Sequence, residues 1–400
     1  MNKIYLALLF ICFTVSAQTE LMLPSFKPDT LLKYDTLVEK PTPLAAKHIQ
    51  RMELNEEITK RRLDSLNEFT PLELVYNQNV KQHIQYYLFQ RREQVSKLLA
   101  LSTYYFPIFE EYLDKNQLPH ELKYIPIIES SLNPNARSYA GAVGLWQFMY
   151  ATGKEYGLRI NNYLDERKDV YKSSQAACEY LKKAYQVFNN WELAIASYNA
   201  GRGNITKGIR RSGGKLNFWL IRPFLPNQTK NYIPSLIAAI YVMNFATEYG
   251  ISPDPNYEMN THEIDSVFLK KAINIEHLAT ILEIDTGLLK KLNPTYRTKL
   301  IPSLDGEKFP IILPNYKVGF FIINEDSIYK RVASMELAEG QTYPLFSDIE
   351  KIRYTIKKGD YLGKIAKKYN CKIQDIMLWN DLKTETIRAG KVISIYRTVK

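Results

Sequence analysis

The residues best suited to chemistry lie in residues 121–157, which read ELKYIPIIESSLNPNARSYAGAVGLWQFMYATGKEYG. The first part fits a helix from about His120, which must end before Asn133 and Pro134 because the residue before a proline avoids helical geometry. Glu129 then sits near the helix C-terminus, behind a short apolar run. The helix dipole and partial desolvation would both raise the pKa of a carboxyl there, which suits a proton donor near neutral pH. On position alone, a solvated surface glutamate is the simpler interpretation.

Three glycines are spaced along the segment after this helix. Gly141, Gly144 and Gly153 permit turns and a close approach of the backbone to a ligand. The chain has 5 histidines, and none forms a zinc-like pair. The histidine pattern is consistent with chemistry that uses neither a metal nor a cofactor.

Helical patterns on both sides must position this stretch. Apolar residues recur at three- and four-residue spacing in residues 81–89, 93–104, 108–116, 174–188, 191–199 and 232–249. The patterns predict a mainly α domain over residues 77–255.

The N-terminus has the pattern of an export signal. A charged start at Lys3 leads into an apolar run, residues 4–15, and small residues follow up to Ala17. The run is shorter than the roughly 20 residues that span a bilayer, which favours a signal peptide over residues 1–17, cleaved near Ala17. The prediction is an exported protein of the periplasm or cell envelope. Residues 18–76 are a polar lead-in, predicted to be partly disordered or helical.

Positive charge is concentrated at the other end. The formal net charge of the 400-residue chain is +11, and residues 351–400 hold 13 Lys and Arg against 4 Asp and Glu, which is +9. A basic terminal module indicates an acidic partner, and export disfavours nucleic acid in that role. A membrane surface or an anionic polymer remains, so peripheral association with the envelope stays open.

The last third contains an internal repeat with a constant offset of 87 positions. Ile275, Leu278, Ala279, Leu282, Leu289 and Asn293 recur as Leu362, Ile365, Ala366, Tyr369, Ile376 and Asn380. Each copy predicts strand, helix, helix, strand. We assign these small βααβ modules to residues 262–316 and 351–398, joined by a linker at 317–350. In the second copy, Asp360 follows a glycine turn and is predicted to be a helix N-cap.

Four motifs occur in order across the helical domain, together with the charged block DERKD at residues 165–169. They read ESSLNPNARS from Glu129, GAVGLWQFM from Gly141, ASYNAG from Ala196 and QTKNYIP from Gln228. With these motifs the chain resembles the catalytic domain of lytic transglycosylases over residues 118–236. The resemblance implies a lysozyme-like domain of the α+β class.

The resemblance also implies roles for individual residues. Glu129 would be the general acid that protonates the glycosidic oxygen and then the base that deprotonates the sugar's own 6-hydroxyl. The implied substrate-binding residues are Ser138, Gln147, Met149, Tyr198, Asn199, Gln228 and Tyr232. Met149 and Tyr198 fit a core position equally well. The family commonly has Glu where this chain has Gln228, which leaves the role of that position open. We interpret Asp165, Glu166, Arg167 and Asp169 as structural, through capping and ion pairs.

The second repeat copy carries KGDYL at residues 358–362 and WN at 379–380, with which it resembles a LysM domain, a binding module for N-acetylglucosamine-containing glycans. The implied glycan-binding residues are Asp360, Tyr361, Leu362, Asn380 and Asp381. Asp360 also fits a pure capping role. The first copy has lost the turn, so we interpret it as a degenerate module that serves as a spacer.

The resemblance thus implies a peptidoglycan lytic transglycosylase, a carbon–oxygen lyase that cleaves the MurNAc-(β1,4)-GlcNAc bond and leaves 1,6-anhydromuramoyl ends. Ordinary glycosidases use two carboxylates, and the motif blocks offer no obvious second one. Two alternatives remain. One is a non-catalytic peptidoglycan-binding protein on a lysozyme-like scaffold, which Gln228 favours. The other is a lysozyme-type hydrolase, in which water enters the product.

Overall fold

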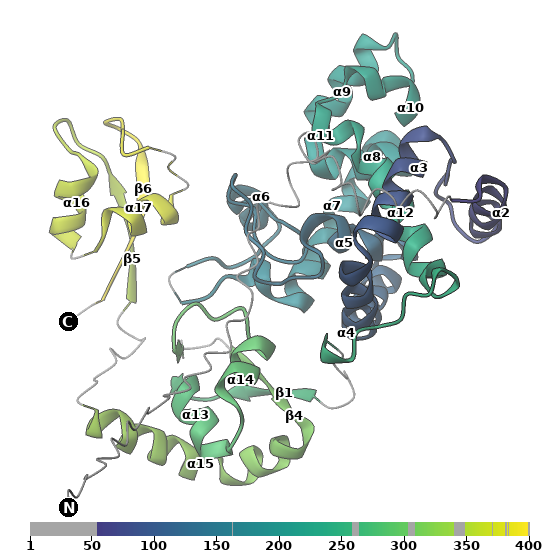
Figure 1. The fold of residues 1–400 in the computed structure, drawn as a ribbon. Helices are drawn as coiled ribbons and strands as arrows, with labels where there is room; N and C mark the ends of the chain where they lie inside the picture. Colours follow the sequence, from purple (N-terminus) through teal and green to yellow (C-terminus); the bar gives the residue numbers. More distant parts are fainter. Residues whose placement is uncertain are drawn as a thin grey trace, which may run out of the picture.

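The computed structural model describes residues 54–161, 163–257, 264–302, 309–339, 349–369, 371–380, 382 and 384–398. The predicted signal peptide, residues 18–53 of the predicted lead-in and Asp381 lie outside these residues. Three hydrophobic cores divide the described chain into a helical domain and two small modules (Figure 1).

The helical domain covers residues 54–257. Its elements are α2 (Glu56–Asn67), α3 (Gln78–Gln85), the π-helix η2 (Tyr86–Gln90), α4 (Arg92–Asn116), η3 (His120–Tyr124), α5 (Ile125–Ser130), α6 (Tyr150–Glu155), η4 (Glu166–Lys168), α7 (Val170–Phe188), α8 (Trp191–Ala200), α9 (Arg202–Arg211), α10 (Phe218–Ile221), η5 (Arg222–Phe224), α11 (Asn227–Lys230), α12 (Tyr232–Phe245), η6 (Ala246–Tyr249) and η7 (Pro255–Tyr257). The prediction of a mainly α domain is confirmed.

Helix α12 is the centre of this domain. It is apolar on all sides, and residues 232–242 are all buried, as expected for a helix surrounded by others. It packs against α3, α5 and α8. Its first residue, Tyr232, therefore reaches the C-terminal end of α5.

The two helices predicted over residues 93–104 and 108–116 are a single helix, α4, which runs through Pro107. A proline inside a helix removes one hydrogen bond and usually breaks it. Here Tyr104, Tyr105, Ile108 and Phe109 are all buried on either side of the proline, and this packing holds the helix together.

The first module pairs β1 (Ile264–Leu269) with β4 (Phe309–Pro314) in antiparallel register and encloses α13 (Ile275–Leu282) and α14 (Thr286–Leu292). In the same module, β2 (Ile273–Asn274) and β3 (Leu300–Ile301) form a second short antiparallel pair.

The prediction of a linker over residues 317–350 is wrong for residues 317–338. Helix α15 (Asn315–Ala338) occupies it and buries Phe321, Ile328, Tyr329 and Val332 in the core of the first module. Those four residues follow helical spacing, so they cover one face of the βααβ unit.

The second module pairs β5 (Ile349–Thr355) with β6 (Val392–Thr398) and encloses α16 (Leu362–Tyr369) and α17 (Ile373–Trp379). The repeat extends to individual hydrogen bonds. Asn380 accepts from the Ser394 N–H and donates to the Ser394 carbonyl, at 2.6 and 2.7 Å. Asn293 does the same with Ile312, at 2.8 and 2.9 Å. The predicted βααβ order is confirmed in both copies.

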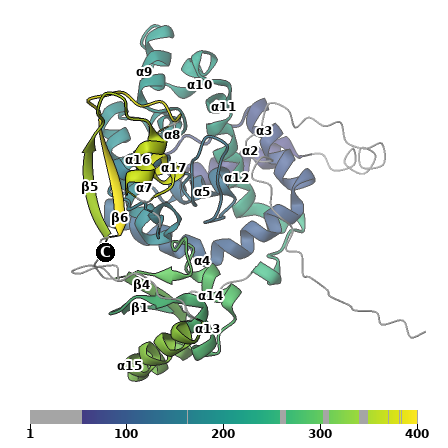
Figure 2. The same cartoon turned by 90° about the vertical axis from the view of Figure 1, so that its left-hand side faces the viewer.

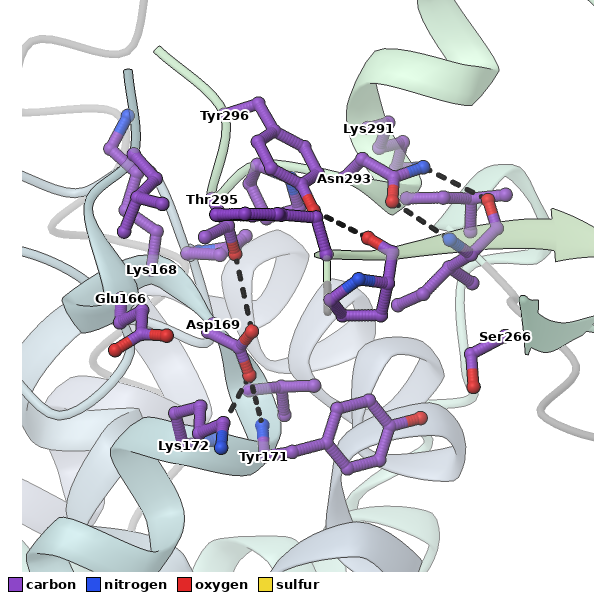
Figure 3. A pocket seen from close by; sticks show the side chains of 18 of the residues that line it. Glu166, Lys168, Asp169, Tyr171, Lys172, Ser266, Lys291, Asn293, Thr295 and Tyr296 are labelled. Atoms are coloured by element: carbon purple, nitrogen blue, oxygen red, sulfur yellow. Dashed lines mark hydrogen bonds between the residues drawn. The ribbon is translucent and has the colours of Figure 1, made fainter. Parts of the chain in front are cut away.

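The first module is docked on the helical domain, in contrast to the predicted spacer (Figures 1 and 2). Asp165 N–H donates to the Thr295 carbonyl, and Arg297 N–H donates to the Tyr163 carbonyl, both at 2.8 Å. Leu164, between them, is buried in the core of the first module. A cavity of about 300 Å³ remains at this junction, beside Asp169 and Tyr296 (Figure 3).

Candidate active site

Glu129 is the penultimate residue of α5, as predicted. The helix ends because Ser131 and Leu132 take left-handed backbone angles, with φ of 52° and 57°. The side chain of Ser130 is buried, and its hydroxyl donates to the Leu145 carbonyl at 2.8 Å. The end of α5 is thereby tied to the glycine-rich loop that follows.

The Glu129 carboxyl has an altered proton affinity. Burial raises its pKa from 4.5 to about 7, and the hydroxyl of Tyr232, which donates to Oε1 at 2.5 Å, opposes that rise. No carboxylate of the described residues contributes to the shift. The group can therefore both donate and accept a proton near neutral pH.

Two tyrosines flank this carboxyl. Tyr232 is 7% exposed, and Tyr198 is half-buried. Burial raises the pKa of both hydroxyls well above 10, and the charge of Glu129 adds to this rise. The Tyr198 hydroxyl donates to the Trp146 carbonyl at 2.7 Å, so Tyr198 also positions the loop. Both hydroxyls therefore stay protonated at neutral pH.

The glycine-rich loop, residues 136–149, folds back on itself through bridges that join Arg137 to Val143 and Val143 to Phe148. Ser138 accepts from the Ala142 N–H through Oγ at 3.0 Å, and so contributes to the turn. Gln147 has φ of 49°, and its side-chain amide donates to the carbonyls of Gly144 at 2.8 Å and Ala136 at 3.3 Å.

Ser138 and Gln147, predicted to bind substrate, thus take part in the loop's internal bonding. Met149 is 42% exposed beside them, which excludes the core position considered for it.

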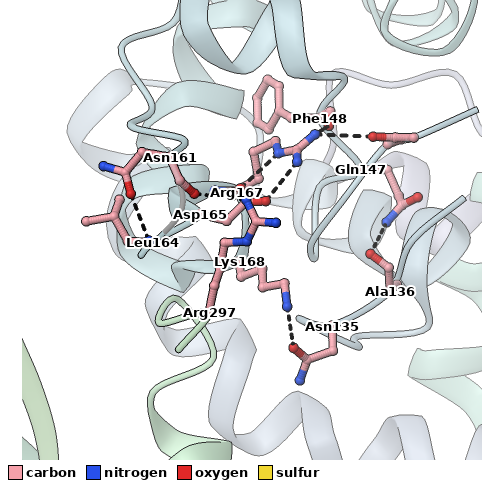
Figure 4. Close-up of polar contacts among 12 residues, drawn as sticks. Asn135, Ala136, Gln147, Phe148, Asn161, Leu164, Asp165, Arg167, Lys168 and Arg297 are labelled. Carbon is pink, nitrogen blue, oxygen red and sulfur yellow. Dashed lines mark hydrogen bonds and ion pairs between the residues drawn. The ribbon is translucent and has the colours of Figure 1, made fainter. Parts of the chain in front are cut away.

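Arg167 contacts the glycine-rich loop through its guanidinium group (Figure 4). Its guanidinium pairs with Asp165 through bonds of 2.9 and 2.8 Å and donates to the carbonyls of Gly141 and Phe148, both at 3.2 Å. Gly144 lies so close that a Cβ atom on it would be 1.8 Å from the Arg167 carbonyl oxygen.

The predicted structural role of the charged block is confirmed. Asp165 caps η4, Glu166 pairs with Arg159 and Asp169 caps α7. The contact of Arg167 with the loop was not predicted, because no sequence pattern links a buried arginine to carbonyls some twenty residues earlier.

The remaining predicted cleft residues come from α8 and α11. Asn199 accepts from the buried Thr229 hydroxyl at 2.9 Å, which ties the third motif to the fourth. Gln228 is exposed, and no contact of the described residues joins its side chain to Glu129. The substrate-binding roles of both remain predictions.

The structure places three of the residues predicted to bind glycan in the LysM-like module, and the binding roles of Asp360 and Asn380 remain predictions. Leu362 is 1% exposed in the module core, so its side chain does not line a groove. Asn380 uses its amide to clamp β6, as described above. Asp360 does not cap the helix, which begins at Leu362. Its carboxylate accepts from the Tyr354 hydroxyl and the Lys357 N–H, which hold its pKa at about 2. Tyr361, by contrast, is 64% exposed and free to contact a ligand.

Comparison with known proteins adds three family matches. Residues 106–219 match the family described as transglycosylase SLT domain, and residues 354–395 match the LysM domain. Residues 263–330 match the LysM-like domain of lytic transglycosylase MltD, a match that extends into α15.

Individual relatives agree with these matches. The chain is 27% identical to membrane-bound lytic murein transglycosylase D of Escherichia coli K12 over 321 residues, 76% of this chain and 68% of that protein. It is 27% identical to the soluble lytic murein transglycosylase of the same organism over 34% of this chain and 22% of that one. The cell wall-binding protein YocH of Bacillus subtilis is 42% identical over 43 residues, 11% of this chain and 15% of its own. Among solved structures, the 70 kDa soluble lytic transglycosylase of Escherichia coli aligns with a TM-score of 0.32 and 21% identity, over 47% of this chain and 34% of that chain.

Proposed function

Because the chain carries a lytic transglycosylase SLT domain with LysM-type modules and is homologous to membrane-bound lytic murein transglycosylase D, we propose that it cleaves the MurNAc-(β1,4)-GlcNAc bond of peptidoglycan and leaves 1,6-anhydromuramoyl ends. It is a lyase-type peptidoglycan enzyme. In our proposal Glu129 is its catalytic residue.

The proposed reaction balances with one carboxyl group. Protonated Glu129 gives its proton to the glycosidic oxygen as the bond from that oxygen to C1 of MurNAc breaks. The ionised carboxylate then takes the proton of the MurNAc 6-hydroxyl, whose oxygen bonds to C1. Glu129 ends protonated, and no water is consumed.

One observation carries this proposal. The pKa of Glu129 is about 7, set by burial and by Tyr232, with no contribution from a carboxylate of the described residues. A retaining or inverting glycosidase would place a second carboxyl group roughly 5–10 Å away to attack or to activate water. A buried carboxyl with a pKa near 7, which no other described carboxylate perturbs, can donate and then accept a proton. It therefore suits a reaction whose nucleophile belongs to the substrate.

Mass spectrometry of digested sacculi tests the proposal. The products should be lighter by one water than those of a lysozyme, with ends that resist borohydride reduction. Hydrated, reducible ends would establish a hydrolase. Binding to sacculi with no release of fragments would instead establish a non-catalytic scaffold.

The Tyr232 hydroxyl should set the pH range of activity. Because it stabilises the carboxylate, Tyr232→Phe should raise the pKa of Glu129 further. The proton-donor form then persists to higher pH, so the alkaline limb of kcat/KM, expected near pH 7, moves upward. Tyr124→Phe is the matched control, since it removes a buried hydroxyl that contacts Asn244 instead. An alkaline limb that stays in place in Tyr232→Phe would remove Glu129 as the titrating acid.

The proposed partner of the second module is the glycan of the same polymer, and Tyr361 is its best placed residue. Deleting residues 351–400 should weaken pelleting with sacculi and leave cleavage of soluble glycan intact. The loss of binding should be larger at low salt, because part of the attraction is electrostatic.

Tyr361→Ala should lower sacculus affinity about two- to tenfold, as expected for the loss of one aromatic contact. Tyr316→Ala, which changes another exposed tyrosine, should not. Equal pelleting of all variants would contradict this assignment.

We also propose that the protein works in the cell envelope after export, in line with the membrane-bound homologue. Within the described residues, no helix has the length and apolar character needed to cross a bilayer.

A further inference from the structure

A basic groove lies between the glycine-rich loop and the first module. Its volume is about 640 Å³, and its lining includes the Asp165–Arg167 pair. Six further basic side chains line it, from both domains: Arg137, Lys168, Lys290, Lys291, Arg297 and Lys299. Figure 4 shows part of the groove, where Lys168 from the helical domain reaches Asn135 and Arg297 from the first module lies near Lys168.

Within the described residues, the positive charge that lines this groove exceeds the negative charge that contacts it. Glu276 accepts from both Lys290 and Lys299 at 2.6 Å, so one acid serves two lysines. Lys168 donates to the neutral side chain of Asn135 at 3.0 Å, and Arg297 to the Asn161 carbonyl at 2.9 Å. The six cations and Glu276 together leave a net charge of +5.

The cations are close enough to affect one another. Burial lowers the pKa of Lys168, and the charges of Arg297, Arg167 and Arg137 lower it further, against the opposing charge of Asp165. Surface lysines and arginines usually spread apart or pair with acids. A shared groove that concentrates them has a strong affinity for anions.

The groove has a fixed geometry because of how the module is docked. The backbone bonds between Asp165 and Thr295 and between Tyr163 and Arg297 form one of its edges. Arg137 and Val143, which an isolated bridge joins within the glycine-rich loop, also line the groove. That same loop carries Ser138 and Gln147, which are proposed to contact the glycan.

We propose that this groove binds the free carboxylates of the peptide stems of peptidoglycan. The proposal rests on the proposed function, which places a glycan strand in the cleft beside Glu129. The sugar backbone of that strand is neutral, and the stems that project from MurNAc carry its carboxylates. Guanidinium and ammonium groups bind carboxylates through charge-assisted hydrogen bonds. The first module thus extends substrate recognition from the glycan to the peptide.

A binding measurement with two forms of the substrate tests the proposal. The full-length chain with Glu129→Gln, which does not consume its ligand, is titrated with soluble glycan strands that carry peptide stems. It is then titrated with the same strands after their stem carboxylates have been converted to neutral methylamides, because removing the stems with an amidase would leave a lactyl carboxylate on every MurNAc. We expect tighter binding of the strands with free stem carboxylates, by a ratio that falls as salt rises.

Lys291→Glu should then lower affinity for strands with free stem carboxylates about three- to tenfold and leave affinity for the amidated strands within about twofold. Lys291→Gln should have a smaller effect in the same direction. Lys330→Glu, the same change at an exposed position on α15 outside the groove, is the matched control and should bind like the parent.

Equal affinity of the parent for both forms, or an equal loss on both forms in Lys291→Glu, would overturn the proposal. These outcomes are separable from a failure of the proposed function. A wild-type digest without anhydro ends would refute the function, and the binding ratio could still be measured.

Discussion

Replacing Glu129 with Gln should lower the rate of glycan cleavage by about a hundred- to ten-thousand-fold or more. Loss of a general acid and base typically costs this much, and here one carboxyl is proposed to serve in both steps. Gln keeps the size and polarity of the side chain and can still meet the Tyr232 hydroxyl. Glycan binding should therefore survive. Release of soluble fragments from sacculi measures the rate, and pelleting measures binding.

The pH dependence of Tm in Glu129→Gln should show whether the Glu129 carboxyl has a raised pKa in the folded chain. The pKa of Glu129 is about 7 in the folded chain against an ordinary value of 4.5, so its contribution to stability is fully present below about pH 4.5 and is lost as pH rises through 7. Gln has no proton to lose. The Tm of Glu129→Gln relative to the wild type should therefore increase between pH 5 and pH 8.

Glu111→Gln is the matched control for both measurements. Its carboxylate is exposed and pairs with Lys115 on the same helix, so the change should alter neither the rate nor the pH dependence of Tm by much. If Glu129→Gln retained more than about a tenth of wild-type activity, the assignment of Glu129 as acid and base would be wrong.

The end of α5 shows how much of the site the sequence determines locally. Pro134 limits the helix, and the apolar run before Glu129 predicts burial, so both the position and the raised pKa follow from neighbouring residues. The contact with Tyr232 does not, because it joins residues 103 positions apart and depends on the packing of α12 against α5. Resemblance to a family supplied Tyr232 where local physics could not.

The errors in the C-terminal third have different causes. Asp360 had the local pattern of an N-cap, but Tyr354 on the neighbouring strand competes for its carboxylate. That competition is a tertiary effect. The helix α15 could have been predicted, because Phe321, Ile328 and Val332 recur at helical spacing. The docking of the first module could not, since nothing before Thr295 in the chain indicates that it pairs with residues 163–165.

The close approach at Gly144 leads to the second large expected effect. Gly141 and Gly144 have nearly the same backbone angle, with φ of 91° and 90°. Replacing either with Ala costs on the order of 1–2 kcal/mol for the left-handed conformation. A Cβ at Gly141 would meet nothing within 4 Å, whereas at Gly144 it would be 1.8 Å from the Arg167 carbonyl oxygen. An alanine at position 144 would therefore displace backbone atoms, and not only a flexible side chain.

Gly144→Ala should therefore lower the free energy of unfolding by roughly 1–3 kcal/mol more than Gly141→Ala, the typical cost of forcing extra atoms into a packed site. It should also lower kcat/KM by at least about tenfold, because a shift of the loop would displace Gln147 and loosen the bond from Ser130 to Leu145 that fixes the end of α5. Gly141→Ala shares the backbone strain but not the clash, so the difference between the two variants isolates the contact with Arg167. Thermal unfolding and rates on soluble glycan measure the two effects. Equal losses in both variants would show that backbone strain alone governs the loop, and that Arg167 does not set its distance from Glu129.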